Sequence, residues 1–407
     1  MMFIALIGII LIICFFLMIW SMTGTLLNHS IIVLLWWIPV YVNVLTYEWD
    51  NTDKIISNSL TLSLFMFILG VGGGYFSCRR NRNNSFILDD SYAVIEIEKK
   101  LNVSTLILVA LFVGFFYSYY GSPLFSSNVD LAKIEFAKEH GIYLRFVKYM
   151  LPLLVFPYLI LSEYKYKKYF VLFMWGGFVA LIGHKGLVMT SFINLMIFSR
   201  INRINLHINY KFLFLISVVW LFFLIKTIVG DQFGSLGSYL LFRLAHIDGL
   251  QIIYENLVPV HGIYYGLTIL NEMASFLNLM GLYNGTSETT GMFIAREYNN
   301  NANYEFEIIS PGAAHLYLNF GNVGVAIGSF ILGRMFSYFL SQMYKSKKPT
   351  KRTFFYLVSL LPVFAFSLGK IGSLIVSDLF SYMLFFAFIV FLQIFIQLLV
   401  LPKRRDI

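Results

Sequence analysis

The sequence predicts an all-α, polytopic integral membrane protein, and three observations predict it. First, 58% of the 407 residues are hydrophobic and only 13% are charged, which is more apolar surface than a water-soluble core needs. Second, apolar runs near the roughly 20 residues that cross a bilayer recur along the chain. Third, many of the Lys and Arg residues lie between these runs. We therefore expect a single transmembrane domain over residues 1–407.

About eleven apolar runs qualify as membrane-spanning helices. The first run has no basic start and no small-residue cleavage site, so we expect it to be retained rather than removed as a signal peptide. In chain order, the runs are residues 3–20, 26–46, 56–76, 101–120, 146–161, 169–182, 187–199, 212–229, 313–340, 354–368 and 374–401.

The distribution of basic residues predicts the orientation, because cytoplasmic loops retain Lys and Arg during insertion. Basic residues gather in one set of connections and at the C-terminus, which we therefore place in the cytoplasm. The opposite side receives a large loop, residues 230–312, with eight acidic residues and only Arg243 and Arg296 as basic ones. A smaller loop, residues 121–145, lies on the same outer side.

Several functional classes are disfavoured by the sequence. The net charge of +9 does not indicate nucleic-acid binding, because the basic residues are dispersed between apolar runs. Cys14 and Cys78 are the only cysteines and imply no disulfide framework. The sequence contains no nucleotide-binding glycine loop and no His/Cys cluster with metal-ligand spacing, so we expect neither a cofactor nor a metal.

The large loop carries the first candidate site. Residues 239–257 have the pattern of a helix on which Arg243 and His246, three positions apart, share one side. Arg243 could serve an anionic ligand, since the loop is otherwise poor in cations, or it could extend to lipid phosphate as an interfacial arginine. Residues 264–283 form another apolar stretch, interrupted by Asn271, Glu272 and Asn278, which we expect to lie at the membrane interface or to dip into it.

A second candidate is the turn Gly183-His184-Lys185-Gly186, which joins two short apolar runs. A helix of about 14 residues reaches only about 21 Å, short of a hydrocarbon core near 30 Å. The turn is therefore predicted to sit in a recess, where ionisable residues such as His184 and Lys185 are usually functional. The alternative is a tight hairpin whose Lys185 simply extends outward.

The third candidate is the outer start of the ninth run, where Pro311 and Gly312 precede His315. Proline suits the first turn of a helix, and the free N–H groups there favour an anion such as a diphosphate. His315 is equally compatible with a purely interfacial histidine. We assign the following glycines, Gly321, Gly324 and Gly328, to close helix packing.

The short-looped spans, the single large external loop, the Gly183 to Gly186 turn and the stretch from Pro311 to Gly321 together resemble the O-antigen polymerase family, the Wzy-type oligosaccharide repeat unit polymerases. The resemblance implies a GT-C-like, metal-independent glycosyltransferase at the periplasmic face of the bacterial inner membrane. It would join undecaprenyl-diphosphate-linked repeat units into O-antigen or capsular polysaccharide, with the growing chain as donor and a single unit as acceptor. A chain-length regulator protein is a possible partner.

By role, the resemblance implies that cations stabilise the departing diphosphate and that a base activates the acceptor hydroxyl. The sequence departs from some family members, because neither Arg243 nor Arg296 is followed by a glycine eleven positions later. The substrate-binding candidates are His184, Lys185, Arg243 and Arg296, and the catalytic candidates are His246, His315 and Glu272, with His184 as a further possible base.

Two other functions remain open. An O-antigen ligase shares the membrane layout and the leaving group but transfers the glycan to lipid A-core. A lipid-linked oligosaccharide flippase belongs to a different class and predicts polar residues at the bilayer midplane and a repeat of two halves. The nearly uniform apolar run 374–401 and the absence of such a repeat disfavour the flippase.

Overall fold

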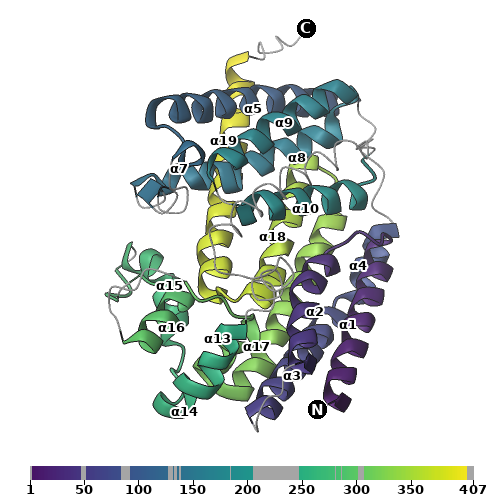
Figure 1. Ribbon diagram of the computed structural model, residues 1–407. Coiled ribbons are helices and arrows are strands. Elements are labelled where there is room, and N and C mark those ends of the chain that lie inside the picture. The colour runs from purple at the N-terminus through teal and green to yellow at the C-terminus, as the bar shows by residue number, and fades with distance from the viewer. Residues whose placement is uncertain are drawn as a thin grey trace. The chain divides into compact units, whose positions relative to one another are not determined.

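The computed structural model describes residues 2–46, 52–83, 92–126, 132, 135–136, 139–183, 185–204, 247–279, 281–285, 287–300 and 307–400 (Figure 1). Every regular element among them is a helix. Seven of these helices are long and apolar enough to cross a membrane: Leu6–Thr23, Ile55–Gly72, Lys99–Phe125, Tyr143–Leu161, Gly312–Lys345, Pro349–Leu368 and Val376–Gln397. Ser30–Val40 and Leu187–Ile201 are shorter apolar helices. The prediction of an all-α, polytopic membrane protein is confirmed, while the predicted run 212–229 lies outside the described residues.

The chain divides into two compact units. The first unit combines Met1–Asn83, Lys226–Tyr344 and Val358–Phe380. The second unit combines Asn84–Ile225, Lys345–Leu357 and Ser381–Ile407. Each unit is assembled from segments that are distant in the sequence, so neither one is a continuous stretch of the chain.

The N-terminal helices of the first unit pack around α1, which contacts α2, α3 and α4 (Figure 1). Helix α1 has no charged residue, and side chains such as Leu6 and Ile13 are about half exposed, as expected for a helix that faces lipid. The bounds are α1 Met2–Thr23, α2 Ser30–Thr46, α3 Thr52–Gly72 and α4 Tyr75–Asn83.

Helix α3 and helix α17, Gly312–Lys345, approach each other along a seam of small residues. A Cβ on Gly70 would overlap the carbonyl oxygen of Phe330, and a Cβ on Gly333 would overlap that of Phe67. The hydroxyls of Ser63 and Ser329 form a hydrogen bond of 2.8 Å across the same seam. Two backbones in direct contact without large side chains are typical of helix association within a bilayer.

The predicted span 313–340 lies within α17, which is one of the candidate membrane spans but is broken at Gly321. This residue has φ 63° and ψ −157°, a conformation that is essentially restricted to glycine. The chain folds back there, since Cβ atoms on Gly324 and Gly328 would meet Phe320 and Leu316, respectively. Gly324 and Gly328 therefore serve close packing as predicted, whereas Gly321 reverses the chain direction.

The described part of the predicted large loop is folded into short helices. Its elements are α13 Ile247–Gln251, the π-helix η3 Ile252–Leu257, α14 Val258–His261, α15 Leu267–Leu279 and α16 Thr290–Asn299. Tyr254 holds this region on the membrane helices, because its hydroxyl lies 2.6 Å from Ser59 Oγ and its ring stacks on Tyr317 with centroids 4.2 Å apart. The described half of the predicted helix 239–257 is thus confirmed as α13 and η3.

In the second unit, α8 contacts both α5 and α9, and α9 contacts α10. Phe156 on α8 packs against Trp175 and Phe198. The bounds are α5 Tyr92–Tyr120, the 3₁₀ turn η1 Pro123–Phe125, α7 Gly141–Arg145, the π-helix η2 Phe146–Met150, α8 Leu151–Leu161, α9 Lys165–Leu181 and α10 Lys185–Ile201. Parts of α18 Pro349–Leu368 and α19 Leu379–Val400 complete this unit, and the π-helix η4 Ser373–Asp378 belongs to the first.

Helices α9 and α10 are longer than the predicted runs but remain short for membrane spans. Each has 17 residues. Helix α9 begins earlier than the predicted run because Lys165 and its neighbours form its first turn. Such a helix reaches about 25 Å, still less than a hydrocarbon core of about 30 Å. Gly183, with φ 74°, forms the turn between them.

Candidate functional site

A cluster of polar side chains lies inside the first unit, where the loop helices meet the ends of α17 and α18. We call Glu272, Glu307, Ser310, His315 and Lys370 the polar cluster. Glu272 belongs to α15, Glu307 and Ser310 precede α17, and His315 lies on the short first half of α17. Lys370 lies in the connection 369–372 between α18 and η4.

His315 is the most enclosed titratable residue of the cluster, with only 2% of its surface exposed. Neither ring nitrogen has a hydrogen-bond partner among the residues that the structure describes. Its position is fixed through the helix backbone, because Asn319 donates from Nδ2 to the His315 carbonyl at 2.8 Å and to Thr268 Oγ1 at 2.7 Å. The imidazole interacts electrostatically with Glu272, Glu307 and Lys370.

Glu272 joins three segments through its carboxylate. Oε1 accepts the N–H of Thr290 at 3.0 Å, and Oε2 accepts those of Gly372 at 2.7 Å and Ser373 at 3.1 Å. These bonds satisfy free N–H groups at the beginnings of α16 and η4, where a negative charge is also favoured by the helix dipole. This use of both oxygens favours a positioning role for Glu272 over the predicted role of general base.

Lys370 and Glu307 form an ion pair with 2.7 Å between Nζ and Oε2. Burial by itself raises the pKa of the Glu307 carboxyl, but the charge and hydrogen bond of Lys370, together with Thr289 and His315, hold it below its ordinary 4.5. The sequence analysis missed both residues. A signal was present, since Gly369 and Gly372 flank Lys370 in the short break between two apolar runs.

Arg296, a predicted diphosphate ligand, forms ion pairs with two acidic residues of the same loop, Glu288 and Glu297. Its NH1 lies 2.9 Å from Glu288 Oε1, and its NH2 lies 3.5 Å from Glu297 Oε1. Burial raises the pKa of Glu288, and the charge of Arg296 offsets part of that rise. Both cations are paired with carboxylates, Arg296 with two and Lys370 with one. Lys370 differs in that it interacts electrostatically with His315, and we therefore select it as the candidate cation for an anionic ligand.

The remaining predicted residues are less completely described. Lys185 is the first residue of α10. His184, Arg243 and His246 lie outside the described residues, and their roles stay predictions. Among the residues that the structure describes, no group of three or more His, Cys, Asp or Glu side chains is placed to hold a metal ion.

Comparisons of this chain with protein-family models, with curated proteins and with solved structures found no match.

Proposed function

We propose that this chain polymerises undecaprenyl-diphosphate-linked oligosaccharide units at the periplasmic face of the bacterial inner membrane. The observation that carries the proposal is the environment of His315. A buried imidazole with no hydrogen-bond partner in the described structure lies beside a cation, Lys370, at the broken end of a membrane helix. Unsatisfied buried polar groups are rare, and broken helices often line binding sites in membrane proteins.

The chemistry of glycosyl transfer matches these groups. His315 accepts the proton of the acceptor hydroxyl, and the acceptor oxygen forms a bond to the anomeric carbon of the growing chain. The bond between that carbon and the diphosphate oxygen breaks, and the lipid diphosphate leaves with the electron pair. Lys370 stabilises the charge that develops on the diphosphate, as a positioned cation does. Atoms and charges balance without a metal ion.

Access to His315 sets a requirement on this mechanism. The imidazole is covered by Gly369, the first residue of the connection 369–372 between α18 and η4. Glu272 accepts hydrogen bonds from Gly372, at the other end of that connection, and from Ser373, the first residue of η4. A hydroxyl therefore reaches His315 only when this connection moves.

Deletion of the gene, followed by electrophoresis of the surface polysaccharide, tests the proposal. We expect single repeat units to remain on lipid A while the ladder of longer chains disappears. Complete loss of attached sugar would overturn the polymerase in favour of a ligase or a flippase.

Complementation with variants tests the site. His315→Ala should reproduce the deletion pattern at normal protein levels. The matched control is His261→Ala, which alters an exposed histidine at the end of α14 and should restore the full ladder. A full ladder with His315→Ala would remove this histidine from the mechanism.

A further inference from the structure

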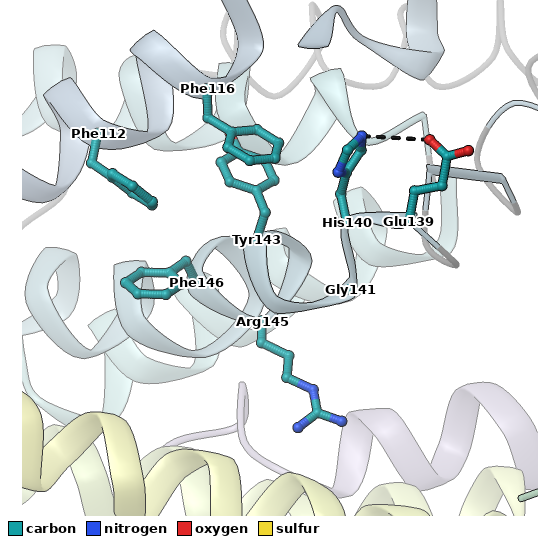
Figure 2. Close-up of a pocket in the computed structure, with 8 residues that line it drawn as sticks. All are labelled: Phe112, Phe116, Glu139, His140, Gly141, Tyr143, Arg145 and Phe146. Atoms are coloured by element: carbon teal, nitrogen blue, oxygen red, sulfur yellow. Dashed lines mark ion pairs between the residues drawn. The ribbon is translucent and has the colours of Figure 1, made fainter. Parts of the chain in front are cut away.

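The second unit contains an aromatic pocket that the proposed chemistry does not use. The cavity measures about 570 Å³ and lies between α5 and the segment from Glu139 to Phe146 (Figure 2). Its walls include the rings of Phe112 and Phe116 on α5, and of Tyr143 and Phe146 on α7 and η2. This volume falls within the range of about 300–1,000 Å³ that is usual for small-ligand sites.

The aromatic wall is built from two ring pairs. Phe116 and Tyr143 stack with centroids 3.7 Å apart and an angle of 9° between their planes, so each ring fixes the other. Phe112 and Phe146 are 5.3 Å apart at 47°. The Phe112 side chain is 48% exposed, so the rest of the protein does not cover its whole ring.

Polar groups occupy one side of the same cavity. Figure 2 shows His140 and Glu139 beside the rings, with His140 Nε2 3.7 Å from Glu139 Oε2. The imidazole is held by Phe116, Tyr120 and Phe136, whose centroids lie 5.3, 4.5 and 4.9 Å from its own. A carboxylate accepts hydrogen bonds, and an imidazole both donates and accepts them.

This combination distinguishes between classes of ligand. A lipid chain would make no polar contact with His140 and Glu139, which are paired with each other. A phosphate would be repelled by Glu139, and Arg145, the one cation among the lining residues, points away from the rings in Figure 2. A saccharide fits both the aromatic and the polar side of the cavity. The C–H face of a sugar ring packs on an aromatic ring, and sugar hydroxyls form hydrogen bonds with carboxylate and imidazole.

We propose that this pocket binds a saccharide, with the C–H face of a sugar ring against the aromatic wall and with hydroxyls bonded to His140 and Glu139. This inference rests on the proposed function, because a polymerase would supply the saccharide as part of its substrate or product. Binding itself requires no turnover and is therefore measured separately.

The test uses the full-length protein in lipid nanodiscs and saturation-transfer NMR. The probe is surface polysaccharide of the bacterium that encodes the chain, released from its lipid by mild acid. We expect transfer to the sugar protons with the unaltered protein, and at least tenfold weaker binding with Phe112→Ala and His140→Ala. Phe112→Leu, which keeps apolar volume but removes the ring, provides a second variant that is compatible with folding.

Phe115→Ala is the matched control, because Phe115 lies on the same helix, is 71% exposed and does not line the pocket. It should bind the probe as the unaltered protein does. Absence of transfer to the unaltered protein, or equal transfer in all variants, overturns the pocket. If saccharide binding depends on the pocket residues but the ladder survives gene deletion, the proposed polymerase function is wrong and the proposed binding site is supported. If the ladder requires the gene but the pocket variants bind the saccharide normally, only the proposed binding site is wrong.

Discussion

Gly369 lies against the imidazole of His315 so closely that a Cβ at position 369 would be 2.5 Å from Nε2. The same atom would be 2.8 Å from the carbonyl oxygen of Ser310. The backbone of Gly369 also has φ 74°, which residues with a side chain rarely adopt. The glycine thus meets two separate requirements, one of backbone conformation and one of space beside His315.

Gly369→Ala should therefore destabilise the protein and reduce polymer formation. The strained backbone costs about 1–3 kcal/mol, and the methyl group displaces His315 in addition. Gly281→Ala is the control, since Gly281 has φ 70° but nothing within 4 Å of its Cβ position. Thermal unfolding should show a loss in both variants, and only Gly369→Ala should shorten the polysaccharide ladder. Equal ladders would mean that the space beside His315 does not matter for activity.

Glu272→Gln should lower stability because the amide provides one acceptor where the carboxylate provides two. At least one of the buried N–H groups of Thr290, Gly372 and Ser373 then loses its acceptor, which costs about 1–3 kcal/mol. The melting temperature should fall, and ladder formation per folded molecule should be partly retained. A variant that folds normally and has no activity would instead identify Glu272 as the base. Leu270→Ala, an exposed position on α15, serves as the control.

The membrane-spanning helices could be predicted because length and apolar composition are sufficient to identify them. The reversal in α17 could not, since the apolar run continues through Gly321 and its φ of 63° leaves no trace in the sequence. The ends of the spans were harder to place for the same reason. Chain direction there is set by backbone angles and by contacts between distant residues.

His315 was predicted as a candidate because Pro311 and Gly312 mark a helix start, which is a local pattern. Lys370 was not, because its partner Glu307 lies 63 residues away and neither residue stands out alone. Glu272 was named as a possible base by role, through the resemblance to the polymerase family. Its three backbone donors come from positions 18, 100 and 101 residues away, which periodicity does not reveal.

Gly333→Val should disrupt the packing of α3 on α17. A Cβ at Gly333 would overlap the carbonyl oxygen of Phe67, so the two backbones must separate. Overpacking of this kind costs about 1–3 kcal/mol. Gly114→Val is the matched control, because Gly114 lies within α5 and has nothing within 4 Å of its Cβ position. Thermal unfolding in detergent should separate the two variants, and equal melting temperatures would contradict the close approach of these helices.

The ion pair of Glu307 and Lys370 should make stability depend on pH on the acid side. Since the pKa of Glu307 is below 4.5 in the folded protein, the unfolded chain binds its proton more readily. The stabilising contribution is therefore complete above the unfolded pKa and is lost as pH falls through the folded pKa. Below about pH 5, the melting temperature should fall less steeply in Glu307→Gln than in the unaltered protein.

Lys370→Gln provides the matching test, because it leaves the Glu307 carboxyl partly buried without its cation. Burial, which raises the pKa of Glu307, is then opposed only by Thr289 and His315, so the loss of stability on acidification should be smaller than in the unaltered protein. Glu288, whose pKa is raised, contributes in the opposite sense and is the same in all three proteins. Parallel pH profiles for the unaltered protein and both variants would show that the pair makes no pH-dependent contribution to folding.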